Sequence, residues 1–594
     1  MAHDEIQTAH MMAPLTTARV VCQAHLGVSA LSHAVSLVSA FMDYATPRFW
    51  SIPRACGRTT TTTDLRLLER LRAHEPPDMD RYHRMHLFSE ALVSAVRADN
   101  LEVMTWLCTV YCREGLTGNA MREAARSGNV RMLEWLAQNC QDTLLWSFRF
   151  MDEAALGGHL DAVVWLDGHP QNPGCSPYVL TNAARNGHIR VVEWLQTHKP
   201  EVESSFPLDT AVTCGQLHVA QYLHEHGHHQ PNLEISMNFV ALKGNLELLE
   251  WLHMQSDAEF SQSVLDHAAA GGHLRIIQWL HTHRSEGCTS HAMDHAATAG
   301  HLDIVQWLHE NRHEGCTTQA MDGAAENGHL EVVQWLHAHR NESCTTRALD
   351  LAALNGHLEV LKWLHANRNE EWSVSVMNNA ATGGHLHIVE WLHGIQTPGR
   401  EGATTDAMDG AAGNGHLDVV KWLHDHRDEG CTQVAMDMAA TNGHLEIVKW
   451  LHANRSEGCT RDAMDGAARN NLIDVVQWLH ANRVEGCSTR AMDQAGSLEM
   501  LEWLHNNRDE GCTANAMSTY HDDFQRLVFL YSHFRYGCSE SVVKWHAFHN
   551  RVEVCLWISE HYPEHRNYLL ENFPEIAGAM QLIRRHNTDG PQRE

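Results

Sequence analysis

The stretch AMDGAAENGHLEVVQWLHAHR, residues 320–340, decides the fold, because close copies of it recur along most of the chain. One aromatic residue anchors each copy, and successive anchors lie 28 to 30 residues apart, except for gaps of 31, 25 and 26 residues. The anchors are Trp106, Trp135, Trp165, Trp194, Tyr222, Trp251, Trp279, Trp307, Trp335, Trp363, Trp391, Trp422, Trp450, Trp478, Trp503, Phe529 and Trp557. Such a period is typical of stacked supersecondary units, so we predict a solenoid.

Each copy predicts two helices. The first runs from residue 320, with Thr318 or Gln319 as its cap, and Gly328 ends it in a left-handed conformation. The second spans residues 330–340 and is apolar over most of its circumference. Such a helix must pack between the helices of both neighbouring copies, with Trp335 as the filler. We therefore expect Trp335→Ala to cost about 3 to 5 kcal/mol.

The run A-A-x-x-G-H-L-E-V-V-x-W-L in these copies resembles the ankyrin repeat, and the Trp-Leu-His style is similar to ankyrin families expanded in oomycetes. Three departures are visible. The unit is 28 residues long instead of about 33, Gln319 to Asp322 replaces T-P-L-H, and Trp replaces a common Leu. The missing residues fall between Arg340 and Thr346. The resemblance therefore implies an all-α, elongated solenoid of stacked helix-turn-helix ankyrin-type repeats with short or absent β-hairpin fingers.

The repeat divides the chain into three predicted regions. Residues 1–87 form an N-terminal helical cap or a recruitment region, residues 88–560 form a solenoid of about 17 units, and residues 561–594 form a capping helix and a disordered tail. The compressed stretch at residues 493–498 predicts a kink in the array near residues 490–525.

Composition narrows the class of partner. The formal net charge is −29, which disfavours binding to a phosphate backbone, so we expect no nucleic-acid partner and favour a basic protein partner. No apolar run is long enough to span a membrane, and no export signal is visible. Cysteines such as Cys288 and Cys316 repeat at one register position, too far apart for disulfides. We therefore expect a reduced, intracellular and cytoplasmic protein that is a monomer.

Two repeated side chains suggest chemistry or structure. The resemblance implies that His329 and its equivalents make loop hydrogen bonds that tie adjacent units together. The position of Asp322 forms either an acidic ladder for a basic ligand or a set of acceptors for loop backbone donors. The tract His224–His229 is a candidate for adventitious metal binding but lacks catalytic zinc spacing. We predict no catalytic residue, metal or cofactor.

Partner binding is expected at first-helix positions that vary between otherwise similar units, because these positions are free of the stacking constraint. The predicted positions are His291, His295, Thr298, Gln319, Gly323, Glu326, Arg347, Leu351 and Leu354. Structural stacking is expected at Trp279, Trp307, Trp335, Trp363, Gly328 and His329. In ankyrin arrays the first-helix face lines a concave groove, and the resemblance implies the same here.

The predicted function is a non-catalytic scaffold that binds a protein partner along the array. Two alternatives remain open. One is an adaptor that recruits cellular machinery, such as a ubiquitin ligase, through residues 1–87. The other is a metal-dependent activity at His224–His229.

Overall fold

The computed structural model describes residues 51–57, 65–200, 202, 206–228, 234–255, 260–368, 374–395, 402–519 and 523–588. These residues form helices and connecting segments, and no strand occurs among them. They divide into two compact units. Unit 1 comprises residues 1–205 and 540–594, and unit 2 comprises residues 206–539. The prediction of an all-α repeat solenoid is confirmed.

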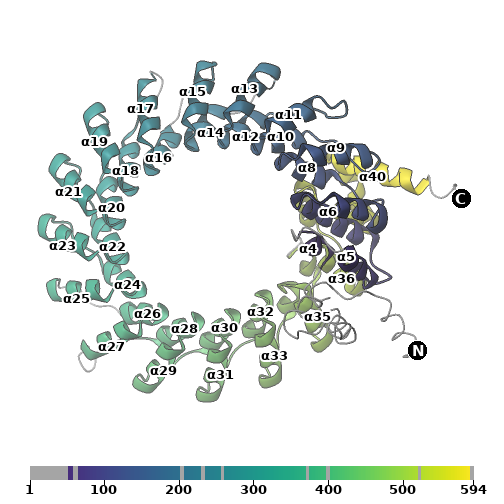
Figure 1. Ribbon diagram of the computed structural model, residues 1–594. Helices are drawn as coiled ribbons and strands as arrows, with labels where there is room; N and C mark the ends of the chain where they lie inside the picture. Colours follow the sequence, from purple (N-terminus) through teal and green to yellow (C-terminus); the bar gives the residue numbers. More distant parts are fainter. Residues whose placement is uncertain are drawn as a thin grey trace, which may run out of the picture. The chain divides into compact units, whose positions relative to one another are not determined.

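Unit 2 repeats a pair of helices. The first helix of each pair lies on the concave side of unit 2, and the second lies on its outer side (Figure 1). The first helices are α14 (Pro207–Thr213), α16 (Glu234–Leu242), α18 (Gln262–Ala270), α20 (His291–Thr298), α22 (Thr318–Glu326), α24 (Thr346–Leu354), α26 (Val374–Thr382), α28 (Thr405–Gly413), α30 (Gln433–Thr441), α32 (Asp462–Arg469) and α34 (Thr489–Asp493). The second helices are α15 (Leu217–Glu225), α17 (Leu246–Met254), α19 (Leu274–His283), α21 (Leu302–Asn311), α23 (Leu330–His339), α25 (Leu358–Asn367), α27 (Leu386–Ile395), α29 (Leu417–His426), α31 (Leu445–Asn454), α33 (Ile473–Asn482) and α35 (Leu498–Asn507). A short 3-10 helix, η2 (Ala514–Met517), and α36 (Phe524–Phe534) complete the unit.

The ends of α22 show how local sequence sets the repeat. The N-cap is Thr317, one residue before the predicted caps, and its hydroxyl accepts from the backbone N–H of Gln319 at 3.1 Å. At the other end Gly328 has φ +77°, a left-handed conformation that glycine adopts without the penalty of a Cβ. The backbone N–H of His329 then bonds to the carbonyl of Ala324 at 2.8 Å. The glycine stop predicted from the sequence is therefore present.

Each pair contributes small residues from its first helix and branched residues from its second helix to a continuous core. In the central copy the buried side chains are Ala320, Met321, Ala324, Ala325, Val332, Val333 and Leu336. The alanines let consecutive first helices pack directly against each other, as α20 does against α22. The core is therefore distributed along the array, and each unit is stabilised by its neighbours.

The connection between units is short. After α23, Arg340 turns the chain into an extended conformation, and α24 begins six residues later. The fingers of a full-length ankyrin unit are therefore absent here, as predicted. Near residues 493–498 the first helices shorten, because α34 has five residues and η2 has four.

Unit 1 joins both ends of the chain. Its first part contains α4 (Ile52–Cys56), α5 (Leu65–Ala73), α6 (Arg81–Arg97), α7 (Leu101–Trp106), the π-helix η1 (Leu107–Tyr111), α8 (Gly118–Arg126), α9 (Val130–Asn139), α10 (Arg149–Leu156), α11 (Leu160–Asp167), α12 (Val179–Arg185) and α13 (Ile189–His198). Its second part contains α37 (Glu540–Phe548), α38 (Val552–His561), η3 (Pro563–His565), α39 (Arg566–Asn572) and α40 (Pro574–Thr588). Helix α38 packs against α6. The predicted boundary after residue 87 falls inside α6, residues 1–50 lie outside the described part, and so does the predicted tail beyond residue 588.

Candidate protein-interaction face

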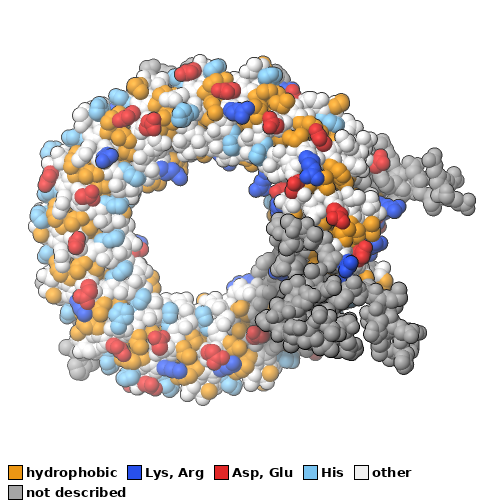
Figure 2. Space-filling model, in the orientation of Figure 1, with side chains coloured by type: hydrophobic (Ala, Val, Ile, Leu, Met, Phe, Trp, Pro, Cys, Tyr) orange, Lys and Arg blue, Asp and Glu red, His pale blue; other side chains and the backbone are white. Residues whose placement is uncertain are grey.

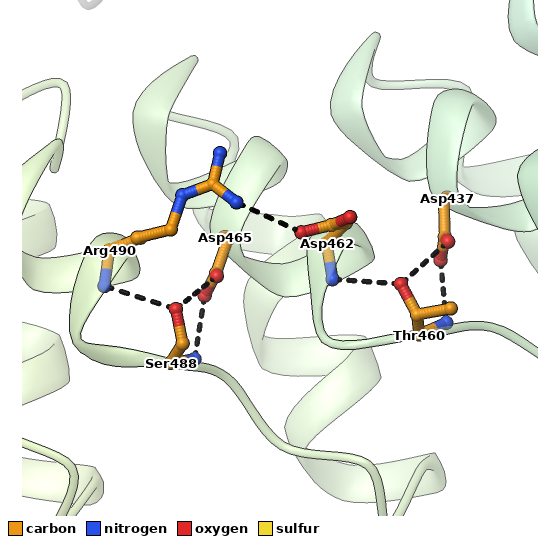
Figure 3. A network of polar contacts seen from close by, with 6 residues as sticks. All are labelled: Asp437, Thr460, Asp462, Asp465, Ser488 and Arg490. Carbon is orange, nitrogen blue, oxygen red and sulfur yellow. Dashed lines mark hydrogen bonds and ion pairs between the residues drawn. The ribbon is translucent and has the colours of Figure 1, made fainter.

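The repeated aspartates are acceptors for the next unit. In α22, Asp322 is buried, and its two carboxylate oxygens accept from the backbone N–H and the hydroxyl of Thr345, both at 2.7 Å. The same pairing joins Asp437 to Thr460 and Asp465 to Ser488 (Figure 3). Both oxygens of each carboxylate accept a hydrogen bond from the next unit, and Asp322 and Asp465 are also buried. Of the two readings of this position, the structure therefore shows the acceptor for loop donors.

The histidines that follow the left-handed glycine hold adjacent units together. His385 uses Nε2 to donate to the carbonyl of Leu354 in the preceding unit at 3.0 Å, and His273 contacts Leu242 in the same way. Each ring also fills the space beside the preceding unit's glycine. A Cβ added to Gly300 would lie 2.6 Å from the ring of His329. The glycine and the histidine therefore depend on each other across the unit boundary.

These contacts predict a pH-dependent stability. Burial lowers the pKa of His329, His385 and His444, and neighbouring histidines lower it further. The unfolded chain therefore binds protons first as the pH falls below about 6.5, so stability is complete above that pH and decreases below it. We expect the melting temperature to fall between pH 7 and pH 5. His329→Gln, a residue the chain itself uses at this position as Gln216, should flatten that dependence, and an unchanged slope in the variant would contradict this assignment.

The anchor tryptophans are less enclosed than the sequence suggested. Trp335 is half-buried on the outer side, where its ring stacks on His339 at a centroid distance of 4.5 Å and meets the edge of His309 from the preceding unit at 5.2 Å. The prediction that it fills a closed core is wrong in this respect, because the branched residues of α23 already close the core. We accordingly lower the expected cost of Trp335→Ala to about 2 kcal/mol.

The arginine that follows several of the second helices contacts the histidine at the position of His309 in the preceding unit. This contact was not predicted from the sequence. Arg368 donates from Nη1 to Nδ1 of His337 in the preceding unit at 3.2 Å, and Arg483 donates to His452 at 3.2 Å. The arginine at this position also donates to a glutamate two residues later in its own loop, as Arg340 does to Glu342 at 2.6 Å. The recurring R-x-E spacing was the signal available in the sequence. These arginine, histidine and tryptophan side chains on the outer side therefore contact one another across unit boundaries.

The predicted recognition positions lie on the concave side, on α20, α22 and α24. His291, His295, Gln319 and Arg347 are exposed, whereas Thr298, Glu326, Leu351 and Leu354 are half-buried. Gly323 is buried, and a Cβ there would lie 2.1 Å from the hydroxyl of Thr298, so the prediction that it contacts a partner is wrong. Figure 2 shows histidine side chains along the concave edge of unit 2. Recognition by the remaining positions stays a prediction.

A cluster of apolar side chains occupies the same register three to four units before Gln319. Phe206 and Ile235 are equivalent to Gln319, and they are 67% and 74% exposed. On α16, Ile235 is followed at i+4 and i+7 by Phe239 and Leu242, which are 45% and 37% exposed. These spacings place the three side chains on one face of the helix. These residues are not among the predicted recognition positions, although their alignment to the repeat gives their register.

Large exposed apolar side chains are concentrated at this register. In the described part of unit 2 there are nine of them, and six occupy positions equivalent to Gln319, Gly323 and Glu326, five on first helices and one at the N-cap of α14. The six are Phe206, Ile235, Phe239, Leu242, Val434 and Met438. Contiguous exposed apolar groups of this kind mark interaction sites. We call Phe206, Ile235, Phe239 and Leu242 the apolar cluster.

The His-rich tract shows no metal site within the described residues. His226 bonds through Nδ1 to the carbonyl of Tyr222, the ring of His224 meets Trp251 edge-on, and His229 lies outside the described part. No group of three or more metal-binding side chains occurs in the described ranges. Nor does any helix there have the length and apolarity needed to cross a membrane.

The stacked helix pairs, cross-unit acceptors and left-handed glycines define a helical repeat array. A family model for ankyrin repeats in many copies matches residues 151–196, 293–337, 321–365, 349–393, 408–452 and 436–480. Ankyrin repeats therefore recur along the matched part of the chain. A comparison with curated proteins finds no match.

Similar solved structures belong to another helical repeat class. The pentatricopeptide repeat protein PPR10 from maize is 12% identical, with 87% of this chain and 82% of that chain covered and a TM-score of 0.28. PPR10 in complex with an 18-nucleotide psaJ RNA element is 11% identical, with 90% of each chain covered and a TM-score of 0.27. A cysteine-to-serine variant in complex with the same RNA gives the same values.

These neighbours correct one prediction. We expected no nucleic-acid partner on the basis of net charge, and two of the neighbours hold RNA. The exclusion of nucleic acid is therefore contradicted and is withdrawn. Because the TM-scores are below 0.3, the likeness does not indicate a ligand for this chain.

Proposed function

We propose that this protein is a scaffold that binds another protein on the concave, first-helix face of unit 2. The observation that supports the proposal is the gathering of six large exposed apolar side chains at the positions that vary between units. Interface energy is usually concentrated in a few large side chains that become desolvated on binding. The outer side supports a structural role instead, because its tryptophan, histidine and arginine residues already contact one another.

The apolar cluster supplies the anchor of this face. Stacked helices lie about 8 to 10 Å apart, so Phe206 and Ile235, which share one register position in consecutive units, form one row. Further along, the exposed polar residues His291, Gln319 and Arg347 add hydrogen-bond donors and acceptors that determine which partner is accepted. A partner segment with apolar side chains at one end and polar ones at the other fits this gradient.

Substitution of the cluster tests the proposal. Ile235→Asp combined with Phe239→Asp places charge on the exposed face without opening the core, because both side chains already contact solvent. We expect partners recovered with the wild-type chain to be lost, and a purified partner to bind at least 30-fold more weakly. Partner retention is measured by quantitative mass spectrometry, and the dissociation constant by calorimetry.

Val484→Asp is the matched control. Val484 is 98% exposed on an outer loop, so the substitution changes charge by one unit away from the concave face. It should leave the partners and their affinity unchanged. Equal retention of partners by the double variant and the control would contradict the proposed face.

A further inference from the structure

The second helix of the last repeat is covered where the others are exposed. Aligned to the repeat, Glu553 is equivalent to Glu331 and Leu556 to Gln334, both of which are exposed in the central unit. In α38 these side chains are buried, with 2% exposure each, because α6 packs against the helix. Tyr82 of α6 also donates to Glu560. A carboxyl group that is normally solvated therefore lies inside unit 1.

A cavity of about 570 Å³ lies beside this buried carboxyl group, and it is formed by α4, α6, α8 and the turn that leads into α38. This volume is within the range of small-molecule binding sites. Four arginines and two glutamates are among its lining residues, namely Arg54, Arg97, Arg122, Arg551, Glu90 and Glu553. The cavity therefore gathers cationic side chains within a protein whose net charge is −29.

Two of the arginines, Arg122 and Arg551, have guanidinium groups that lie near glutamates of unit 1 but form no hydrogen bond or ion pair within the described residues. Arg97 is neutralised by Glu123, to which it donates two hydrogen bonds of 2.8 and 3.0 Å. Arg122 and Arg551 make no side-chain hydrogen bond or ion pair with any residue that the structure describes. A guanidinium group offers five donors in a planar fork that matches carboxylate and phosphate oxygens. Both groups are therefore available to an oxyanion in the cavity.

The two carboxyl groups oppose an anion less than their number suggests. Burial raises the pKa of Glu553 to about 7, although a hydrogen bond from Ser89 favours its charged form. Burial also raises the pKa of Glu90. The arginines remain charged at every accessible pH. Around neutral pH the cavity therefore carries more positive than negative charge.

We propose that this cavity binds a small organic anion with phosphate or carboxylate groups, held by Arg122 and Arg551. Its volume exceeds that of one inorganic phosphate and fits a ligand with two or more oxyanion groups. The site is independent of the concave face of unit 2, so either assignment stands without the other. Bound anion would connect α8 to α38 and stabilise unit 1.

Calorimetry on the full-length chain, with inorganic pyrophosphate and with citrate as probes, tests this site. We expect at least one probe to bind, and Arg122→Gln and Arg551→Gln each to weaken it at least tenfold. Arg126→Gln, an exposed arginine one turn further along α8, is the matched control and should bind as the wild type does. Circular dichroism establishes that each variant is folded, and the Lys substitution at the same position replaces any Gln variant that is not.

The two probes distinguish phosphate from carboxylate as the recognised group. No heat from either probe at 5 mM would overturn the proposal. Equal weakening by Arg126→Gln would also overturn it, because it would indicate nonspecific attraction. So would binding that appears only when residues 1–50 are removed, because it would indicate that the chain itself fills the cavity.

Discussion

Asp322→Ala is expected to destabilise the units on both sides of α22 by about 3 kcal/mol. The substitution removes the acceptor of two hydrogen bonds from Thr345, one of them from a backbone N–H. A hydrogen bond to a charged group contributes about 1.5 to 3 kcal/mol, and an abandoned donor adds a desolvation cost. Because units are coupled to their nearest neighbours, native-state hydrogen exchange should show faster local opening at residues 320–350 than elsewhere.

Asp322→Asn is the control for that experiment. The chain itself places Asn378 at the equivalent position, where its Oδ1 accepts from the N–H of Thr404 at 3.0 Å and its Nδ2 donates to the Thr404 hydroxyl at 2.8 Å. The amide therefore reproduces both contacts, and we expect a loss below about 1 kcal/mol. Equal destabilisation by Ala and Asn would contradict the acceptor role and point to charge alone.

Gly328→Ala is expected to cost about 3 kcal/mol as well, for a different reason. Gly328 has φ +77°, where a non-glycine residue loses about 1 to 2 kcal/mol. Its Cβ would also lie 2.5 Å from Nδ1 of His357, so the ring that joins the two units must move. The measurement is again hydrogen exchange, here across the boundary between α22 and α25.

Gly511→Ala separates these two contributions. Gly511 has φ +69°, but nothing lies within 4 Å of an added Cβ. Only the backbone penalty applies, so a cost of about 1 kcal/mol is expected. If both variants lose the same stability, contact with the histidine ring contributes nothing, and the account of the unit boundary is wrong.

Most of the fold could be predicted from the period of the sequence repeat. Residues such as Gly328, Ala324 and Val333 recur because each unit must present the same surfaces to its neighbours, so their positions predict two helices, a left-handed stop and a distributed core. The role of Asp322 could be narrowed to two alternatives but not decided, because the hydroxyl that it meets belongs to the next unit, 23 residues later.

The environments of Gly323, Trp335 and Glu553 could not be predicted from the repeat pattern. The residue type at the position of Gly323 varies between units, which suggested a role in recognition. The residue there is glycine where the preceding first helix places a threonine against it, as Thr298 lies against Gly323. Trp335 was assigned to the core because it is large and apolar, but Val332, Val333 and Leu336 of the same helix already close the core and leave the ring half-buried. Burial of Glu553 follows from α6, whose packing on α38 joins residues more than 400 positions apart. No local period encodes such a contact.

Site-specific photo-crosslinking tests the binding face most directly. A photoreactive amino acid placed at Ile235 in the full chain should crosslink a partner that also binds the unmodified protein, whereas the same group at Val484 should not. The crosslinked peptides, identified by mass spectrometry, should join the partner to the peptide of α16 that carries position 235. Crosslinks from Val484 with none from Ile235 would contradict the concave face as the site of partner binding.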